Sequence, residues 1–98
     1  MVIKILHLIN GEKIIGRVEE ESDTEIIISK PYLLLMQQNP VNPESIGIGL
    51  IKWILTDEAI VINKSAVIVI YNPSENIKKY YYEVSSDITI SSEIISGE

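Results

Sequence analysis

The first residues that can carry chemistry are the carboxylates of "EEESD", residues 19–23. Such oxygens bind Mg²⁺ and Ca²⁺, but the cluster lacks the ligand spacing of a cation-binding loop, so a solvated turn is favoured. The one histidine, His7, lies in an apolar stretch, and spacing alone builds no serine–aspartate–histidine arrangement around it. The chain holds no cysteine, which excludes a cysteine nucleophile, a thiolate metal site and a disulfide scaffold. We therefore expect a protein that is not an enzyme and holds neither a metal nor a cofactor.

Two lysines next to three tyrosines form a second candidate site, Lys78 and Lys79 with tyrosines 80–82. Aromatic rings beside positive charge hold single-stranded nucleic acid without sequence preference. The alternative is that Tyr81 packs a helix onto the body of the protein while the lysines stay in solvent. We favour the alternative, because Tyr81 lies at helical spacing from Ile77.

Composition predicts the elements that must position these residues. The 98 residues allow one domain, and a chain of this length buries only about 60–65% of its unfolded surface. Hydrophobic residues make up 46% of the chain, with 21 isoleucines and 7 valines but only 2 alanines. Because β-branched side chains suit a pleated surface and alanine favours helices, this bias predicts an all-β fold.

Five or six short strands follow from the apolar runs and the turns between them. "NGEK" and "EESD" are turn signals, and "NPVNPES", residues 39–45, is the clearest loop. Proline cannot donate to a ladder, so Pro31 should mark a bend or bulge after which "PYLLLMQQ" continues the third strand. Such a pattern is typical of a small antiparallel barrel or sandwich. The predicted strands are residues 3–9, 13–20, 24–30, 46–56, 59–62 and 66–71.

The period of the apolar residues changes after residue 73. Ser74 can cap a helix, and Ile77, Tyr81 and Val84 then repeat at helical spacing, which predicts a short amphipathic helix over 74–85. The last residues are acidic and rich in serine, so we expect a flexible tail. The expected organisation is a β-barrel over residues 1–73, the helix over 74–85 and the tail over 86–98.

Two glycines lie five residues apart, Gly11 in a turn and Gly16 inside a predicted strand. Glycine weakens a strand, but it also lets a strand bend sharply because it has no Cβ. A sheet that curls on itself within about 60–70 residues needs such a bend. Gly16 is therefore predicted to be the bend of the second strand, and Gly11 the tight turn before it.

These glycines also carry a resemblance to a known family. "LINGEKIIGRV" resembles the first motif of Sm-like (LSm) proteins, and "AIVINKSAVIVIY" looks like their second motif in the style of the bacterial Hfq branch. The resemblance covers residues 3–72, and "GIGLIKW" with a tyrosine-bearing C-terminal helix also looks like Sm-like proteins of bacteriophages. It implies a small, strongly bent, five-stranded antiparallel barrel of the SH3 type with a short C-terminal helix. The chain departs from the family in opening with a strand where Sm-like proteins usually have a helix.

The resemblance also implies a nucleic-acid site. In the family, uridine-rich RNA is bound in a pore by an aromatic or asparagine pair from the turn between strands two and three, and by a basic residue from the last turn. This sequence offers Asp23 and Thr24 at the first position and Asn63 and Lys64 at the second. Amide and ammonium groups suit a base edge and a phosphate. The neighbouring carboxylates, however, would repel phosphate.

Two functions are therefore open. The leading interpretation is a homo-oligomeric ring, closed through edge strands, that binds single-stranded RNA without catalysis. The alternative is a ring without RNA affinity that serves as a structural or protein-interaction module. The net charge of −6 and the lack of a basic stripe favour the alternative. No apolar run approaches the length of a membrane span and the N-terminus lacks a secretion signal, so a cytoplasmic protein without a membrane partner is expected.

Overall fold

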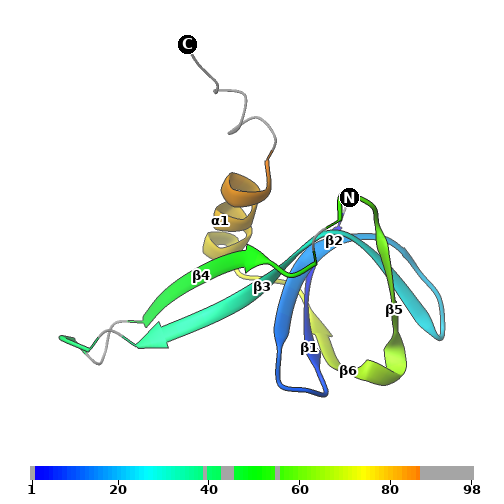
Figure 1. Ribbon diagram of the computed structural model, residues 1–98, viewed down its shortest axis with the longest axis horizontal. Helices are drawn as coiled ribbons and strands as arrows, with labels where there is room; N and C mark the ends of the chain where they lie inside the picture. Colours follow the sequence, from blue (N-terminus) through cyan, green and yellow to red (C-terminus); the bar gives the residue numbers. More distant parts are fainter. Residues whose placement is uncertain (1, 39, 43–45, 55, 87–98) are drawn as a thin grey trace, which may run out of the picture.

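The computed structural model describes residues 2–38, 40–42, 46–54 and 56–86. These residues form six strands, a short 3₁₀ turn and one α-helix (Figure 1). The helix α1 (Glu75–Ser85) ends the described chain, and the turn η1 (Lys64–Ala66) joins the last two strands. The strands are β1 (Val2–Leu8), β2 (Lys13–Glu21), β3 (Glu25–Gln38), β4 (Ile46–Lys52), β5 (Ile60–Asn63) and β6 (Val67–Tyr71).

All strand pairs are antiparallel, in the order β4-β3-β2-β1-β6, and β5 pairs with β3. The long strand β3 serves two partners along one edge. Its residues 25–28 pair with β5, whereas residues 32–38 pair with β4. The predicted antiparallel β fold with a C-terminal helix is therefore confirmed. The count of five strands that the resemblance implies is wrong, because β3 continues past Pro31 and pairs with β5 before the bend and with β4 after it. Each of the six predicted apolar runs does contribute one strand.

The prediction of a closed barrel is also wrong. β5 and β6 lie at the two ends of the curled sheet, and no ladder joins them within the described part of the chain. After the turn η1, β6 pairs with β1, whereas β5, before the turn, pairs with β3. The sheet curves strongly but stays open between these two strands (Figure 1).

The sheet bends at Gly16, as the sequence predicted. The register between β2 and β3 shifts between Ile15 and Arg17, so that Gly16 faces an irregularity in β3. A Cβ on Gly16 would collide with the side chain of Ile28 and lie 3.3 Å from the carbonyl oxygen of Ser29. Only glycine lets the two strands approach this closely.

The partner side of this bend lies in β3 at Lys30 and Pro31. Lys30 has a φ of +49°, a left-handed conformation that few residues other than glycine adopt. The register shift confirms the expected bulge at Pro31. The turn before β2 also behaves as predicted, since Gly11 has a φ of +93°.

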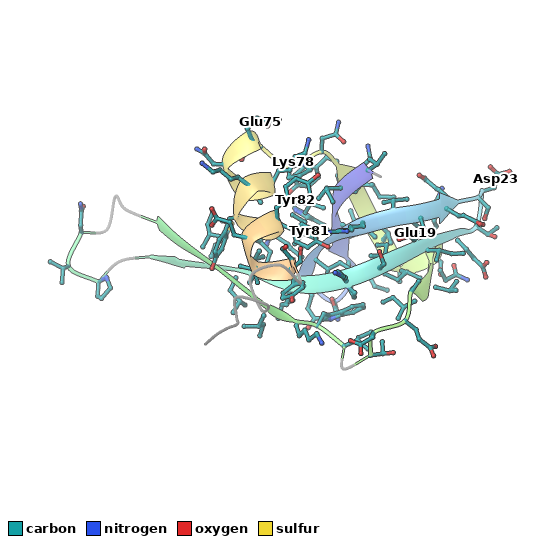
Figure 2. All side chains as sticks on the ribbon, turned by 90° about the horizontal axis from the view of Figure 1, so that it is seen from above. Glu19, Asp23, Glu75, Lys78, Tyr81 and Tyr82 are labelled. Atoms are coloured by element: carbon teal, nitrogen blue, oxygen red, sulfur yellow. The ribbon has the colours of Figure 1, made fainter. Side chains whose placement is uncertain are left out.

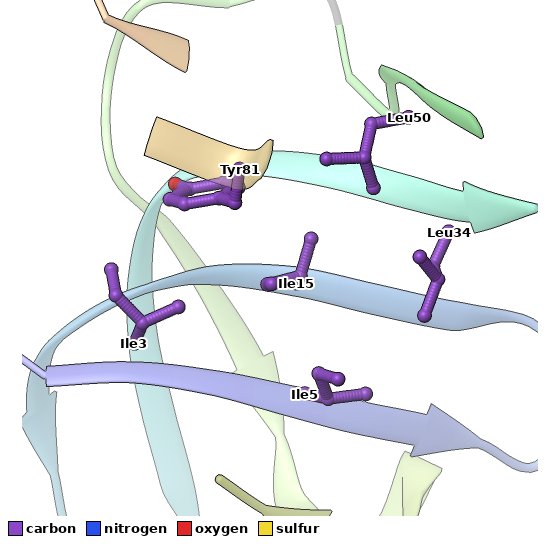
Figure 3. Packing of buried hydrophobic residues seen from close by; sticks show 6 residues of the cluster. All are labelled: Ile3, Ile5, Ile15, Leu34, Leu50 and Tyr81. Atoms are coloured by element: carbon purple, nitrogen blue, oxygen red, sulfur yellow. The ribbon is translucent and has the colours of Figure 1, made fainter. Parts of the chain in front are cut away.

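Apolar side chains fill both faces of the sheet. One cluster lies inside the curl, on the face of Leu6, Ile14 and Ile28. The other lies on the opposite face, where α1 covers it with Tyr81 (Figure 3). The members of this second cluster are Ile3, Ile5, Ile15, Leu34, Leu50 and Tyr81. A sheet with two apolar faces thus needs α1 to cover one of them.

The helix begins as predicted. The Ser74 hydroxyl accepts a hydrogen bond from the backbone N–H of Ile77 at 3.3 Å, which caps the first turn. Residues 39, 43–45 and 87–98 lie outside the described residues, so most of the predicted loop and tail are not placed. Within the residues described, no helix is long and apolar enough to cross a membrane.

Candidate functional site

The turn between β2 and β3 is held by Ser22. Its hydroxyl accepts hydrogen bonds from the backbone N–H groups of Thr24 and Glu25, at 3.3 and 3.1 Å. The backbone N–H of Ser22 in turn donates to the carbonyl of Glu25 at 2.8 Å. This local network leaves the side chains of Asp23 and Thr24 exposed at the tip of the hairpin. Figure 2 shows Asp23 at this tip, far from α1.

The turn η1 lies against the same tip. The Lys64 backbone N–H donates to the Thr24 carbonyl at 2.8 Å, and Asn63 pairs with Glu25 in the β5–β3 ladder. All the residues that the resemblance implies for RNA binding therefore gather at one end of the molecule. Two of them, Asn63 and Lys64, already have side-chain partners within the protein, however. The Asn63 side-chain oxygen accepts from the backbone N–H of Ser65 at 2.9 Å and caps η1.

Lys64 is engaged by a carboxylate. Its ammonium group lies 2.7 Å from the Glu21 carboxylate, and both side chains are partly exposed. Glu20, Asp23 and Glu25 add three more carboxylates to this end of the hairpin. One ammonium group among four carboxylates gives a negative field, which disfavours phosphate.

The other residues singled out in the sequence have structural partners. The His7 ring lies 2.7 Å through Nε2 from the Tyr71 hydroxyl, and the two rings meet edge to face at 5.1 Å. This pair connects β1 to β6. The side chain of Tyr81, a residue of α1, is fully buried against the sheet. This confirms that the helix uses this tyrosine for packing rather than for stacking on a ligand.

A group of hydrogen bonds between the bend of β3 and α1 was not predicted from the sequence. The Tyr81 hydroxyl donates to the Lys30 carbonyl at 2.7 Å, and the Lys30 ammonium donates to the Ser85 carbonyl at 3.3 Å. Burial raises the pKa of Tyr81 to about 12, although the guanidinium of Arg17 opposes the shift. These residues are far apart in sequence, and the left-handed conformation of Lys30 gives no sequence signal of its own.

Three strands expose one edge each, because β4, β5 and β6 have a single neighbour in the described sheet. β5 and β6 contain no charged residue. Their exposed side chains include Val61, Ile68 and Val69, which are 58%, 65% and 44% exposed. Soluble proteins usually protect such edges with charges or prolines, and β5 and β6 have neither.

No family model matches the chain, and none of the curated proteins matches it.

Proposed function

We propose that this chain is an Sm-like subunit that assembles head to tail into a homo-oligomeric ring and acts as a non-catalytic structural or protein-interaction module. The observation that carries this proposal is the pair of uncharged, apolar edge strands β5 and β6. They lie at the two ends of one curled sheet. An edge of one copy that pairs with the other edge of the next forms a heterologous contact, which closes into a ring when the rotation per contact allows it.

The strand arrangement supports the Sm-like part of the proposal. The resemblance implies a strongly bent antiparallel sheet with a glycine hinge in β2 and a tight polar turn between the last two strands, and the bend at Gly16 and the turn η1 match these features. An open sheet is compatible with it, because the gap between β5 and β6 is filled by neighbouring copies in the ring. The family assignment remains a proposal, tested first by the state of assembly.

The mass in solution tests the assembly. Size-exclusion chromatography with light scattering should give a multiple of the 11.0 kDa subunit mass for the unmodified chain. Val61→Lys places a charge on the β5 edge and should shift the mass toward that of the subunit. A matched control is Val41→Lys, at a residue 90% exposed between β3 and β4, which should keep the mass of the unmodified chain. A monomeric unmodified chain would contradict the proposal.

A second candidate function is the binding of single-stranded RNA. The gathering of Thr24, Asn63 and Lys64 at one tip favours it, whereas the Glu21 ion pair and the surrounding carboxylates oppose it. Titration of fluorescent oligo-U and oligo-A at low salt, where charge-driven binding is strongest, distinguishes the two functions. Under the proposed function we expect no binding at tens of micromolar. Binding that Lys64→Ala weakens would instead establish the RNA function.

A further inference from the structure

The outer part of β3 and β4 forms a two-stranded ribbon, made of residues 34–38 and 46–50. β3 pairs with β2 only as far as Leu33, so beyond that residue β4 is its single neighbour in the described sheet. Figure 1 shows this β3–β4 ribbon extending away from the curled part of the sheet. Two strands alone are only marginally stable in water. A segment that adds a third strand would therefore stabilise the ribbon.

The free edge of β4 can accept another strand. β4 contains no proline, and its one charged residue, Lys52, lies at its C-terminal end. On the face that α1 covers, Leu50 is buried in the cluster around Tyr81. Ile48 lies two residues away on the same face, and both Ile48 and its β3 partner Met36 are exposed, by 38% and 58%. Such an edge offers backbone hydrogen bonds and apolar side-chain contacts to an added strand.

The chain leaves α1 beside the C-terminal end of β4. The Tyr32 hydroxyl donates to the carbonyl of Val84 at 3.5 Å, and Tyr32 is the β3 residue that pairs with Lys52. A cavity of about 400 Å³ between the end of α1 and the end of β4 leaves space for the chain to pass. Ser86 already has an extended backbone, with φ −77° and ψ 132°. A strand that continues from Ser86 along this edge would start at Lys52 and run antiparallel to β4.

The residues that follow Ser86 have the length and the pattern of such a strand. Residues 87–98 outnumber the seven residues of β4. Ile88, Thr89 and Ile90 are all β-branched and alternate between apolar and polar, which is typical of a strand with one apolar face. β4 alternates in the same way, because Ile48 and Leu50 share the face that α1 covers. The two patterns therefore match in an antiparallel pair.

We propose that residues 88–91 add to the free edge of β4 in the same chain as an antiparallel strand. Ile88 and Ile90 then lie on the face of Leu50 and Ile48, and this strand replaces the flexible tail expected for these four residues. The occupant is the chain's own C-terminal segment because it is tethered beside the edge, at an effective concentration of about 1 mM or more. A second copy would instead lose translational and rotational freedom on binding. The β4 edge is distinct from the β5 and β6 edges that carry the proposed function.

Hydrogen exchange of the backbone amides in the full chain, followed by ¹H–¹⁵N spectra, tests the added strand. Alternate amides of residues 88–91, and the β4 amides that do not donate to β3, should exchange at least about tenfold more slowly than in an unstructured peptide of the same sequence. Exchange of residues 88–91 at the rate of that peptide would overturn the proposal. Protection of the β4 edge without protection of residues 88–91 would assign the edge to a second copy, which also overturns it.

Two proline variants locate the segment that pairs. Ile90→Pro removes an amide and places a ring in the proposed ladder, so the β4 edge should lose its protection and exchange at least about tenfold faster. Ser96→Pro makes the same kind of change beyond the proposed strand and should leave the β4 edge protected. The amides of the β1–β2 ladder should exchange equally in both variants, which verifies that the fold is kept. Equal behaviour of the β4 edge in the two variants would overturn the proposal.

The Val61→Lys variant distinguishes pairing within one chain from pairing between copies. Its β5 edge carries a charge, so the proposed ring should be lost, whereas the protection of residues 88–91 should persist. Loss of this protection in Val61→Lys would show that the added strand comes from a neighbouring copy and would overturn the proposal. If the unmodified chain is itself monomeric, the proposed ring fails, but protected amides at residues 88–91 still support the added strand.

Discussion

The β2–β3 ladder has two contrasting regions, the hairpin tip and the bend. At the tip, Ser22 organises a turn through bonds to residues two and three positions away, and the ion pair of Lys64 with Glu21 is partly exposed. At the bend, Gly16 allows a backbone approach that any side chain would block, and Tyr81 reaches Lys30 across 51 positions of the sequence. The tip is polar and exposed, so its side chains can be substituted at little cost. The bend is closely packed and tolerates few substitutions.

This difference shows that the polar residues that stand out in a sequence are not the ones on which the fold depends most. The tip holds most of the carboxylates of the hairpin, and it attracts a functional interpretation for that reason. The bend holds few polar groups, but they are partly or fully buried and form hydrogen bonds with residues far away in the sequence. Because buried interactions contribute more to stability than exposed ones, substitutions at the bend should have larger effects than substitutions at the tip.

The largest expected effect is that of Gly16→Ala. The new Cβ would collide with Ile28, which is fully buried and cannot move aside. Overpacking of this kind lowers the free energy of unfolding by about 2–3 kcal/mol, measured by urea denaturation. Gly49→Ala is the matched control, because its Cβ would meet only the Cβ of Leu35 at 4.0 Å. Similar losses in both variants would show that the bend is no more constrained than β4.

Much of the bend was predictable from single residues. Gly16 interrupts an apolar strand and Pro31 cannot donate to a ladder, so each one marks an irregularity without knowledge of its partner. Ser74 before a helical repeat likewise predicted the start of α1. The sequence could not show that the two irregularities face each other, because that depends on the register between β2 and β3.

The predicted closure of a five-stranded barrel failed for a related reason. A short turn such as η1 does not reveal whether the strands on either side pair with each other or with distant strands. Here β5 pairs with β3 and β6 with β1, which leaves the sheet open. The hydrogen bonds that join Lys30 to Tyr81 and Ser85 were equally invisible, since β3 and α1 are far apart in the sequence and only the fold brings them together.

Removal of the Tyr81 hydroxyl should have an intermediate effect. Tyr81→Phe keeps the buried ring but deletes the bond to the Lys30 carbonyl, so the free energy of unfolding should fall by about 1 kcal/mol at neutral pH. Because folding raises the pKa of Tyr81 from 10.0 to about 12, the unfolded chain loses this proton first as the pH rises. The unmodified chain should therefore lose stability between pH 10 and 12, by a total on the order of 2 kcal/mol.

The difference in the free energy of unfolding between the unmodified chain and Tyr81→Phe isolates the contribution of the Tyr81 hydroxyl. Urea unfolding of the unmodified chain and of Tyr81→Phe, repeated across that pH range, subtracts the titration of the lysines and the other tyrosines. The variant should show the smaller decline, so that the two stabilities first converge and then cross as the pH rises through the window. Parallel declines would show that the phenol is no more protected than an exposed tyrosine.

The smallest effect on stability is expected at the tip, from Glu21→Gln. Its ion pair with Lys64 is partly exposed, so the free energy of unfolding should change by no more than about 0.5 kcal/mol and the change should shrink further in salt. Glu58→Gln, the same substitution at an exposed site after β4, is the control. The variant also decides what Glu21 does for function. If Lys64 is a phosphate ligand held back by Glu21, the substitution should create measurable oligo-U binding at low salt; if the tip is only a solvated turn, the variant will bind no better than the unmodified chain.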